Sequence, residues 1–389
     1  MEYGRLPQNN TIGHGYKMTN TPPSIEDDVP IRNLLQVAIL DSLLPDPFSG
    51  FRAAEFNYYM EKQNWKVYST NSEFDTLYPS YIKIYPNTKE KIIKFNKDVK
   101  IQTDLMYIVF LDLAYHSLSY LEKNAIPFIF TLYPGGGFQL NNAEANAKLI
   151  RICESPVFRG VIVTQKISYD YLISQNFCNQ EKIKLIYGGV LDSTLAKQII
   201  RRPRLDQAIK ICFVARKYEV GGVSKGFDTF VKLCSELKDI KNLSFHVVGD
   251  FTEEDIKEKS IPIKFYGVMT TQQLIEFYSE MDILISPNRP SKYIKGHFDG
   301  FPTGCAIEAG MSGVALICTD PLGCNTIFTP NEIIIVQDDL QEIKNRVLHL
   351  KDNLQELDEI AANGRNKMLS EFNIDKQIYD RISFFQSRT

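Results

Sequence analysis

Residues 298–320 read FDGFPTGCAIEAGMSGVALICTD, and they set the interpretation of the whole chain. An acidic, glycine-rich loop with Asp299 precedes a short helical run that carries Glu308 and ends at Gly313, a common residue just past a helix. The apolar run at 314–318 is typical of a parallel strand buried on both faces. The loop–helix junction at Thr303 and Gly304 offers backbone N–H groups to an anion. This pattern suits a sugar nucleotide, with an ordinary surface turn as the alternative.

The composition predicts two domains and no metal or disulfide framework. At 389 residues the chain exceeds the size at which single cores stop growing. Its net charge of −3 gives no electrostatic argument for a nucleic-acid partner. The cysteines are scattered without CxxC spacing. No apolar run is long enough to cross a membrane, and residues 1–30 lack the apolar centre of a signal peptide, so we expect a cytoplasmic protein.

Two series of apolar strands alternate with helices, as expected of two doubly wound parallel sheets in an α/β fold. The first series is predicted at residues 35–40, 67–69, 106–111, 127–132, 160–164 and 184–187. The second is predicted at residues 210–215, 243–248, 263–266, 283–286, 314–318 and 333–336, before a helical tail at 340–372.

A glycine turn and a polar, proline-containing stretch between the two series mark the domain boundary. We therefore divide the chain into a flexible arm at 1–30, an acceptor-side domain at 31–200, a donor-side domain at 205–370 and a terminal helix at 371–389. A return of this helix to the first domain is left open.

Candidate site residues follow the carboxyl ends of predicted strands, where open parallel sheets bind ligands. Gly50 stands at a strand-to-helix crossing, where a glycine lets a ligand approach the backbone. Arg216 ends a strand, and Lys225 follows the glycine-rich loop after it. A guanidinium and an ammonium beside one loop suit a diphosphate, whereas either alone is more often a surface cation.

Two further positions have competing interpretations. The glycines at 135–137 suit either a ligand-contacting loop, with Gly136 near the ligand, or a tight turn. His116 follows another strand, where a structural histidine is more common than a catalytic one. Neither GxxxxGK[ST] nor GxGxxG opens either half, so a P-loop NTPase and nicotinamide chemistry are not favoured.

Two basic segments, with Lys89, Lys91 and Lys94 in one and Arg201 and Arg202 in the other, allow two interpretations. A solvated face is favoured. Peripheral contact with the inner face of a membrane is the alternative.

The chain resembles the retaining glycosyltransferases of family 4, which have the two-domain GT-B fold. FVARKYEVGGVSKGF at 213–227 looks like the strand, Arg, loop and Lys that bind the donor diphosphate in that family. DGFPTGCAIEA at 299–309 resembles its acidic signature, and TLYPGGGF at 131–138 resembles a loop of the first domain. Three departures stand out: the first acid is Asp, eight residues instead of seven separate it from the second, and the first loop is longer.

The resemblance implies two Rossmann-like domains facing a central cleft. It implies that Asp299 contacts the donor sugar, Glu308 holds the ribose and His116 falls near a sugar-contacting histidine. The expected catalytic residues are therefore Asp299 and His116, and the expected donor-binding residues are Arg216, Lys225, Glu308, Thr303, Gly304, Gly50 and Gly136.

The predicted function is transfer of a sugar from a nucleotide-diphosphate donor to a hydroxyl of a glycan, polysaccharide or lipid-linked acceptor. Retention of configuration and no metal or other cofactor are expected. Two alternatives remain: a sugar-nucleotide 2-epimerase of the same fold, and a catalytically silent subunit that binds a nucleotide sugar.

Overall fold

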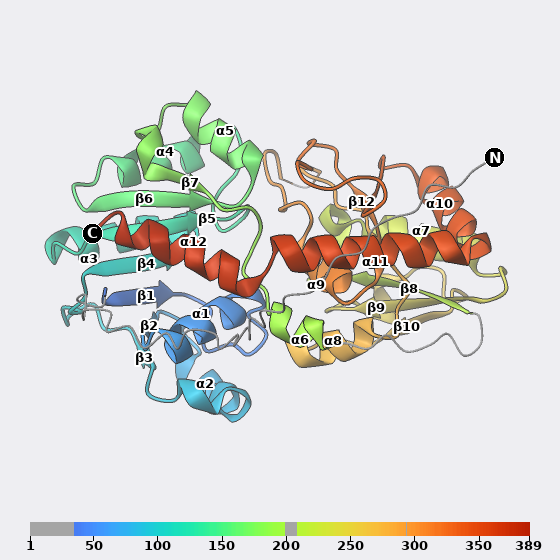
Figure 1. Cartoon of the computed structure of the whole chain (residues 1–389), viewed down its shortest axis with the longest axis horizontal. Helices are drawn as coiled ribbons and strands as arrows, with labels where there is room; N and C mark the ends of the chain where they lie inside the picture. The colour runs from blue at the N-terminus through green and yellow to red at the C-terminus, as the bar shows by residue number, and fades with distance from the viewer. Residues whose placement is uncertain (1–34, 199–207, 293) are drawn as a thin grey trace, which may run out of the picture. The chain divides into compact units, whose positions relative to one another are not determined.

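Two parallel sheets organise the described part of the chain, residues 35–198, 208–292 and 294–389 of a computed structural model (Figure 1). The predicted arm at 1–30, and the cations Arg201 and Arg202, lie outside these residues. The doubly wound parallel sheets predicted from the sequence are confirmed.

The first sheet has the strand order β3-β2-β1-β4-β5-β6-β7. Its strands are β1 (Val37–Asp41), β2 (Lys66–Ser69), β3 (Ile92–Lys94), β4 (Leu105–Val109), β5 (Phe128–Leu132), β6 (Phe158–Val163) and β7 (Ile183–Leu185). All its strand pairs are parallel. The chain order reverses between β1 and β4, which is where such sheets bind ligands.

Helices cover both faces of the first sheet. They are α1 (Phe51–Lys62), α2 (Phe74–Ile84), α3 (Leu111–Lys123), α4 (Ala143–Cys153) and α5 (Lys166–Ser174), and the short α6 (Ser193–Lys197) follows. Successive side chains of a strand point to opposite faces. Ala38 and Leu40 accordingly pack with α3, α4 and α5, whereas Val37 and Ile39 pack with α1 and α2.

The second sheet repeats the plan with the order β10-β9-β8-β11-β12-β13. Its strands are β8 (Ile209–Val214), β9 (Leu243–Val248), β10 (Ile263–Phe265), β11 (Ile283–Ser286), β12 (Ala315–Thr319) and β13 (Ile334–Val336). The helices are α7 (Phe227–Leu237), α8 (Thr271–Tyr278), α9 (Gly304–Met311), α10 (Leu340–Asp352) and α11 (Leu354–Glu371), and the 3-10 turn η3 (Val220–Lys225) precedes α7. The order reverses between β8 and β11, so both sheets place a reversal near the same set of loops.

The structure refines two expectations. The helical tail predicted at 340–372 is two helices, because Asn353 has a non-helical backbone between α10 and α11. The basic stretch at 89–100 contains the short edge strand β3, where Lys94 pairs with Asp75.

The last helix, α12 (Ile374–Gln386), packs on the first sheet, although it follows α11 of the second half (Figure 1). The Arg381 and Glu55 side chains are both fully buried, with Arg381 Nε 3.3 Å from Glu55 Oε1. The aromatic ring of Phe385 lies 4.9 Å from that of Tyr107 on β4. A buried charge that lost its partner would be strongly destabilising, so this ion pair holds the chain's end to the first half. No helix in the described residues is long and apolar enough to cross a membrane.

Candidate active site

A cavity of about 330 Å³ lies where the carboxyl ends of strands from both sheets meet. The segments that follow β1, β4, β5 and β6 of the first sheet and β8 and β11 of the second all contribute to its wall. Most of the predicted site residues line it: Gly50, Arg216, Lys225, Asp299, Thr303, Gly304 and Glu308. The topology therefore brings together residues that are up to 258 positions apart in the sequence (308 minus 50).

Lys225 and Asp299 form the central ion pair of this cavity. Lys225 Nζ donates to Asp299 Oδ1 and Oδ2 at 2.6 and 2.7 Å. Burial lowers the pKa of the Lys225 ammonium, but the Asp299 carboxylate outweighs burial and leaves that pKa above its ordinary value. Lys225 is therefore a cation at neutral pH, held inside the cavity where an anionic group can reach it.

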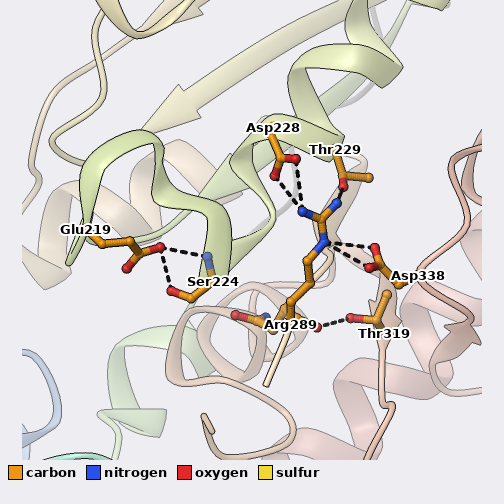
Figure 2. Close-up of polar contacts among 8 residues, drawn as sticks. Glu219, Ser224, Asp228, Thr229, Arg289, Thr319 and Asp338 are labelled. Atoms are coloured by element: carbon orange, nitrogen blue, oxygen red, sulfur yellow. Dashed lines mark hydrogen bonds and ion pairs between the residues drawn. The ribbon is translucent and has the colours of Figure 1, made fainter. Parts of the chain in front are cut away.

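The loop that carries Lys225 is fixed by its own polar contacts (Figure 2). One carboxylate oxygen of Glu219 accepts from both the N–H and the hydroxyl of Ser224, each at 2.7 Å. Gly221 and Gly222 have positive φ angles of 77° and 58°, which most side chains would make costly. The loop reaches the cavity already shaped, so binding a ligand there has little ordering cost.

Arg289 ties this loop to its neighbours, and Figure 2 shows the contacts of its side chain. Its backbone N–H donates to the Ser224 carbonyl at 2.8 Å. Its side chain donates to Asp228 at 2.8 and 2.9 Å, to Asp338 at 3.0 Å and to Thr229. A guanidinium can serve several acceptors at once because its donors lie in a rigid plane.

Arg216 stands at the end of β8 with much of its guanidinium free for a ligand. Its Nε lies 3.6 Å from Asp250 Oδ2, and about half of its side chain is exposed. No other partner of its guanidinium occurs in the part of the chain that the structure describes. The Nη atoms are therefore available to fork onto an anion.

Glu308 is a half-buried carboxyl without an ion-pair or side-chain hydrogen-bond partner among the described residues. Burial raises its pKa to about 7. Its carboxylate lines the cavity and has acceptor capacity that no side chain of the described residues uses. Two vicinal hydroxyl groups would use this capacity by donating to its oxygens.

The N-terminus of α9 faces the same space. Thr303 is its N-cap, and the Thr303 hydroxyl makes no capping hydrogen bond. The first N–H groups of a helix lack intrahelical partners and attract anions. A methyl group on Gly304 would meet nothing within 4 Å, so the approach to these N–H groups is open.

An adjoining cavity of about 160 Å³ shares Gly50, Arg216 and Glu308 with the first. Apolar atoms dominate its remaining wall, which includes Val248 and Leu274. This apolar slot lies beside the Glu308 carboxylate, which can accept from hydroxyl groups, and near the cations Arg216 and Lys225. It therefore suits a planar aromatic base. The described residues contain no group of three or more His, Cys, Asp or Glu side chains placed to hold a metal ion.

Two predicted residues do not reach either cavity. His116 is exposed on α3 and lines neither wall. Gly136 lies in a tight turn, in which the Phe138 N–H donates to the Gly135 carbonyl at 3.0 Å. A Cβ on Gly136 would stand 2.1 Å from the Phe110 ring, so packing against the start of α3 requires this glycine. Of the two interpretations of the glycine run, the tight turn accounts for Gly136.

Several residues of the cavity wall were not predicted from the sequence. Gln165 follows β6 as Arg216 follows β8, so the rule of strand ends could have found it. Tyr218, 72% exposed, lies in the long loop before Lys225, with Lys225 Nζ 5.0 Å from its ring centroid. The extra length of that loop is the feature of the sequence that could have identified Tyr218.

Known glycosyltransferases are similar to parts of the sequence. Residues 229–381 match the model of a family described as glycosyl transferase-like. An uncharacterised glycosyltransferase of Methanocaldococcus jannaschii is 24% identical over 273 residues, 65% of this chain and 66% of that protein. A 2-deoxystreptamine N-acetyl-D-glucosaminyltransferase of Niallia circulans is 28% identical over 152 residues, 38% of each chain. The chain therefore matches less than two thirds of the length of each of these curated relatives.

The fold extends further than the sequence similarity. HepE of Anabaena, solved in complex with UDP and glucose, matches 91% of this chain and 100% of its own, with a TM-score of 0.68 and 14% identity. At that identity the likeness concerns the fold alone. Together with the two parallel-sheet halves, it shows that the chain has the GT-B fold.

Proposed function

We propose that this chain is a glycosyltransferase that moves a sugar from a nucleoside diphosphate donor to a hydroxyl of an acceptor. The observation that carries the proposal is one cavity in which the unpaired Glu308 carboxyl stands beside the cations Arg216 and Lys225. A nucleoside diphosphate offers a ribose diol to the first and two phosphates to the others. The glycosyltransferases similar in sequence, and the UDP held by HepE, support the same class of donor.

The donor would bind with each part opposite a matching group. The base enters the apolar slot beside Val248 and Leu274, and the ribose hydroxyls donate to Glu308. The diphosphate meets Arg216, Lys225 and the free N–H groups at the start of α9. The transferred sugar then lies toward Asp299, whose carboxylate accepts from its hydroxyls.

The chemistry requires stabilisation of the leaving group more than a strong base. As the bond between C1 and the diphosphate oxygen breaks, negative charge grows on the diphosphate and positive charge on the sugar ring. The acceptor oxygen bonds to C1, and its proton passes to the departing phosphate. We infer that Arg216, Lys225 and backbone N–H groups meet the growing charge without a metal ion. Retention of configuration is proposed from the family resemblance.

The acceptor is proposed as a carbohydrate hydroxyl, free or carried on a lipid. Peripheral membrane contact through the segment of Lys89, Lys91 and Lys94 belongs to this proposal. Lys94 already pairs with Asp75, and Lys91 Nζ donates to the Met60 carbonyl. Lys89 is exposed, so anionic vesicles should bind the protein less after Lys89→Glu than before. Equal binding would remove this segment from the proposal.

One observation favours a second candidate, a sugar-nucleotide 2-epimerase. A carboxyl with a pKa of about 7, as in Glu308, is suited to acid–base catalysis at neutral pH. An epimerase needs no acceptor and exchanges the hydrogen at C2 of the sugar with solvent. Incubation of the nucleotide sugar in D2O without acceptor therefore separates the two candidates, since only the epimerase incorporates deuterium.

The proposed function is tested by nucleotide binding followed by turnover. UDP, GDP, ADP and TDP are titrated into the purified chain by calorimetry, and the sugar nucleotides of the one that binds are assayed with candidate acceptors. Binding of one diphosphate, weaker binding in Arg216→Ala, and a glycosylated product of retained configuration are expected. Binding without any turnover would favour a catalytically silent subunit, and no binding at all would refute the proposal.

A further inference from the structure

The segment between β11 and α9 packs on the first half of the molecule. The Leu140 N–H donates to the Gly296 carbonyl at 2.9 Å. A Cβ on Gly296 would stand 2.1 Å from the Leu140 carbonyl oxygen, so the two backbones are in close contact. Phe298 is 2% exposed within the core of the first half, and its ring centroid lies 5.9 Å from that of Phe138.

The first half also forms hydrogen bonds with the backbone N–H and the backbone carbonyl of Phe301 in this segment. The Phe301 N–H donates to Gln165 Oε1 at 3.1 Å, and the Phe301 carbonyl accepts from the Tyr187 hydroxyl. Gln165 is 2% exposed, and a Cβ on Gly300 would stand 3.0 Å from its Nε2, so Gly300 leaves the room that Gln165 occupies. With donor and acceptor both engaged from one side, the backbone at Phe301 cannot rotate without losing a hydrogen bond.

Asp299 lies between these attachments, while its carboxylate binds Lys225 of the second half. Its position therefore depends on contacts from both halves. The Phe298 ring fixes one side of Asp299, and the two hydrogen bonds to Phe301 fix the other. A carboxylate that must meet a sugar within hydrogen-bond distance is sensitive to displacements of about 1 Å.

We propose that Gln165 and Tyr187 are positioning residues that hold Asp299 in the geometry needed for transfer. This inference rests on the proposed function, because it assigns Asp299 to the transferred sugar. Tyr187 does not line the cavity, so it reaches the site through its hydrogen bond to the Phe301 carbonyl, and its hydroxyl also contacts Thr326. Arg216, Lys225 and Glu308, which would bind the rest of the donor, stand on elements of the second sheet, and no hydrogen bond joins them to Gln165 or Tyr187 in the described residues.

The cleanest variant is Tyr187→Phe. It keeps the ring that stacks on Phe372 at 6.0 Å and removes only the hydroxyl. Gln165→Leu removes the acceptor for the Phe301 N–H, whereas Gln165→Glu keeps a carboxylate oxygen in its place. Tyr169→Phe is the matched control, because it removes a tyrosine hydroxyl whose one hydrogen-bond partner in the described residues is the surface amide of Gln180.

We expect kcat to fall about tenfold in Tyr187→Phe and in Gln165→Leu, with the dissociation constant for the nucleoside diphosphate changed by no more than about twofold. Gln165→Glu should recover much of kcat, which a role of the Gln165 amide N–H groups in binding substrate would not allow. Amide hydrogen exchange of residues 296–303 should accelerate in the first two variants and not in Tyr169→Phe.

Unchanged kcat and unchanged exchange in both variants would overturn the inference. So would a loss of nucleotide affinity in step with kcat, since that indicates general loosening of the fold. Failure of the unmodified protein to bind any nucleoside diphosphate is a different result and refutes the proposed function. In that event the exchange measurement still decides whether the two hydrogen bonds hold the segment.

Discussion

The ammonium of Lys225 lies 2.6 Å from the carboxylate of Asp299, although the two residues are 74 positions apart in the chain. Lys225 belongs to a loop of the second sheet, whereas the segment of Asp299 is hydrogen-bonded to the first half. The pair therefore links the loop of Lys225 to a segment that is attached to the first half, at the centre of the cavity. A bound donor would share these charges, with the diphosphate near the ammonium and the sugar hydroxyls near the carboxylate.

Substitutions of the two partners should separate binding from transfer. Asp299→Asn should lower kcat about a hundredfold or more while nucleotide affinity is kept or increased, because Lys225 loses its internal counter-ion. Lys225→Met should weaken nucleoside diphosphate binding about tenfold to a hundredfold, because a charge-assisted contact is lost. Calorimetry and initial rates measure the two effects. Equal loss of affinity in both variants would contradict the division of roles.

Arg216→Ala should raise the dissociation constant for the nucleoside diphosphate by about tenfold. Arg216→Lys should recover part of this loss, since an ammonium keeps the charge and loses the fork. The matched control is Arg346→Ala on α10, an exposed arginine that lines neither of the two site cavities. A similar loss in the control would indicate a general charge effect rather than a binding site at Arg216.

The pKa of about 7 at Glu308 predicts a stability that depends on pH. Burial raises this pKa above its ordinary value of 4.5, so the folded chain holds the proton more tightly than the unfolded chain. Stability from this group is present below about pH 4.5 and is lost as the pH rises to 7. Glu308→Gln should therefore melt at a higher temperature than the unmodified protein at pH 8, and this advantage should shrink by pH 5.

Donor binding should depend on pH in the opposite direction to stability, because the ionised form of Glu308, which destabilises the fold, is the form that binds the donor. Ribose hydroxyls donate to the ionised form, so affinity for the nucleotide sugar should fall as the pH drops below about 7. Glu308→Gln should bind more weakly at pH 8 and show little of this dependence. A sugar nucleotide is the suitable probe, because its diphosphate does not titrate in this range. An identical pH profile in the variant would remove Glu308 from the ribose site.

The fold and the centre of the site could be predicted because both follow from local patterns. Fully buried parallel strands such as β1 and β12 are continuous apolar runs. The carboxyl ends of β8 and β11 mark where Arg216 and Asp299 should meet. The edge strand β3 was missed because its basic, partly exposed sequence lacks that signature.

The other wrong predictions have two causes. Some residues pack against partners that are far away in the sequence, and the exposed face of α3 was not considered. Gly136 was interpreted as a ligand glycine because the Phe110 ring that requires it comes from another loop. The exposure of His116 could have been predicted, since Leu111, Ala114 and Leu118 form the buried stripe of α3 and His116 faces away from it. Gln165 is uncharged, so its residue type did not indicate a site residue. Its proposed positioning role depends on its hydrogen bond with Phe301, which is far away in the sequence.

The two glycines of the predicted site should respond differently to alanine. A Cβ at Gly136 would meet the Phe110 ring at 2.1 Å with φ at +55°, so Gly136→Ala should destabilise the fold by about 1–3 kcal/mol. Its folded fraction should bind the nucleoside diphosphate normally.

A Cβ at Gly304 would have open space, and Gly304 has a helical backbone, so Gly304→Ala should leave the melting temperature unchanged or slightly higher. Its methyl group would stand before the N–H groups of α9, so diphosphate affinity should fall. Weaker binding in Gly136→Ala with full affinity in Gly304→Ala would place the diphosphate elsewhere.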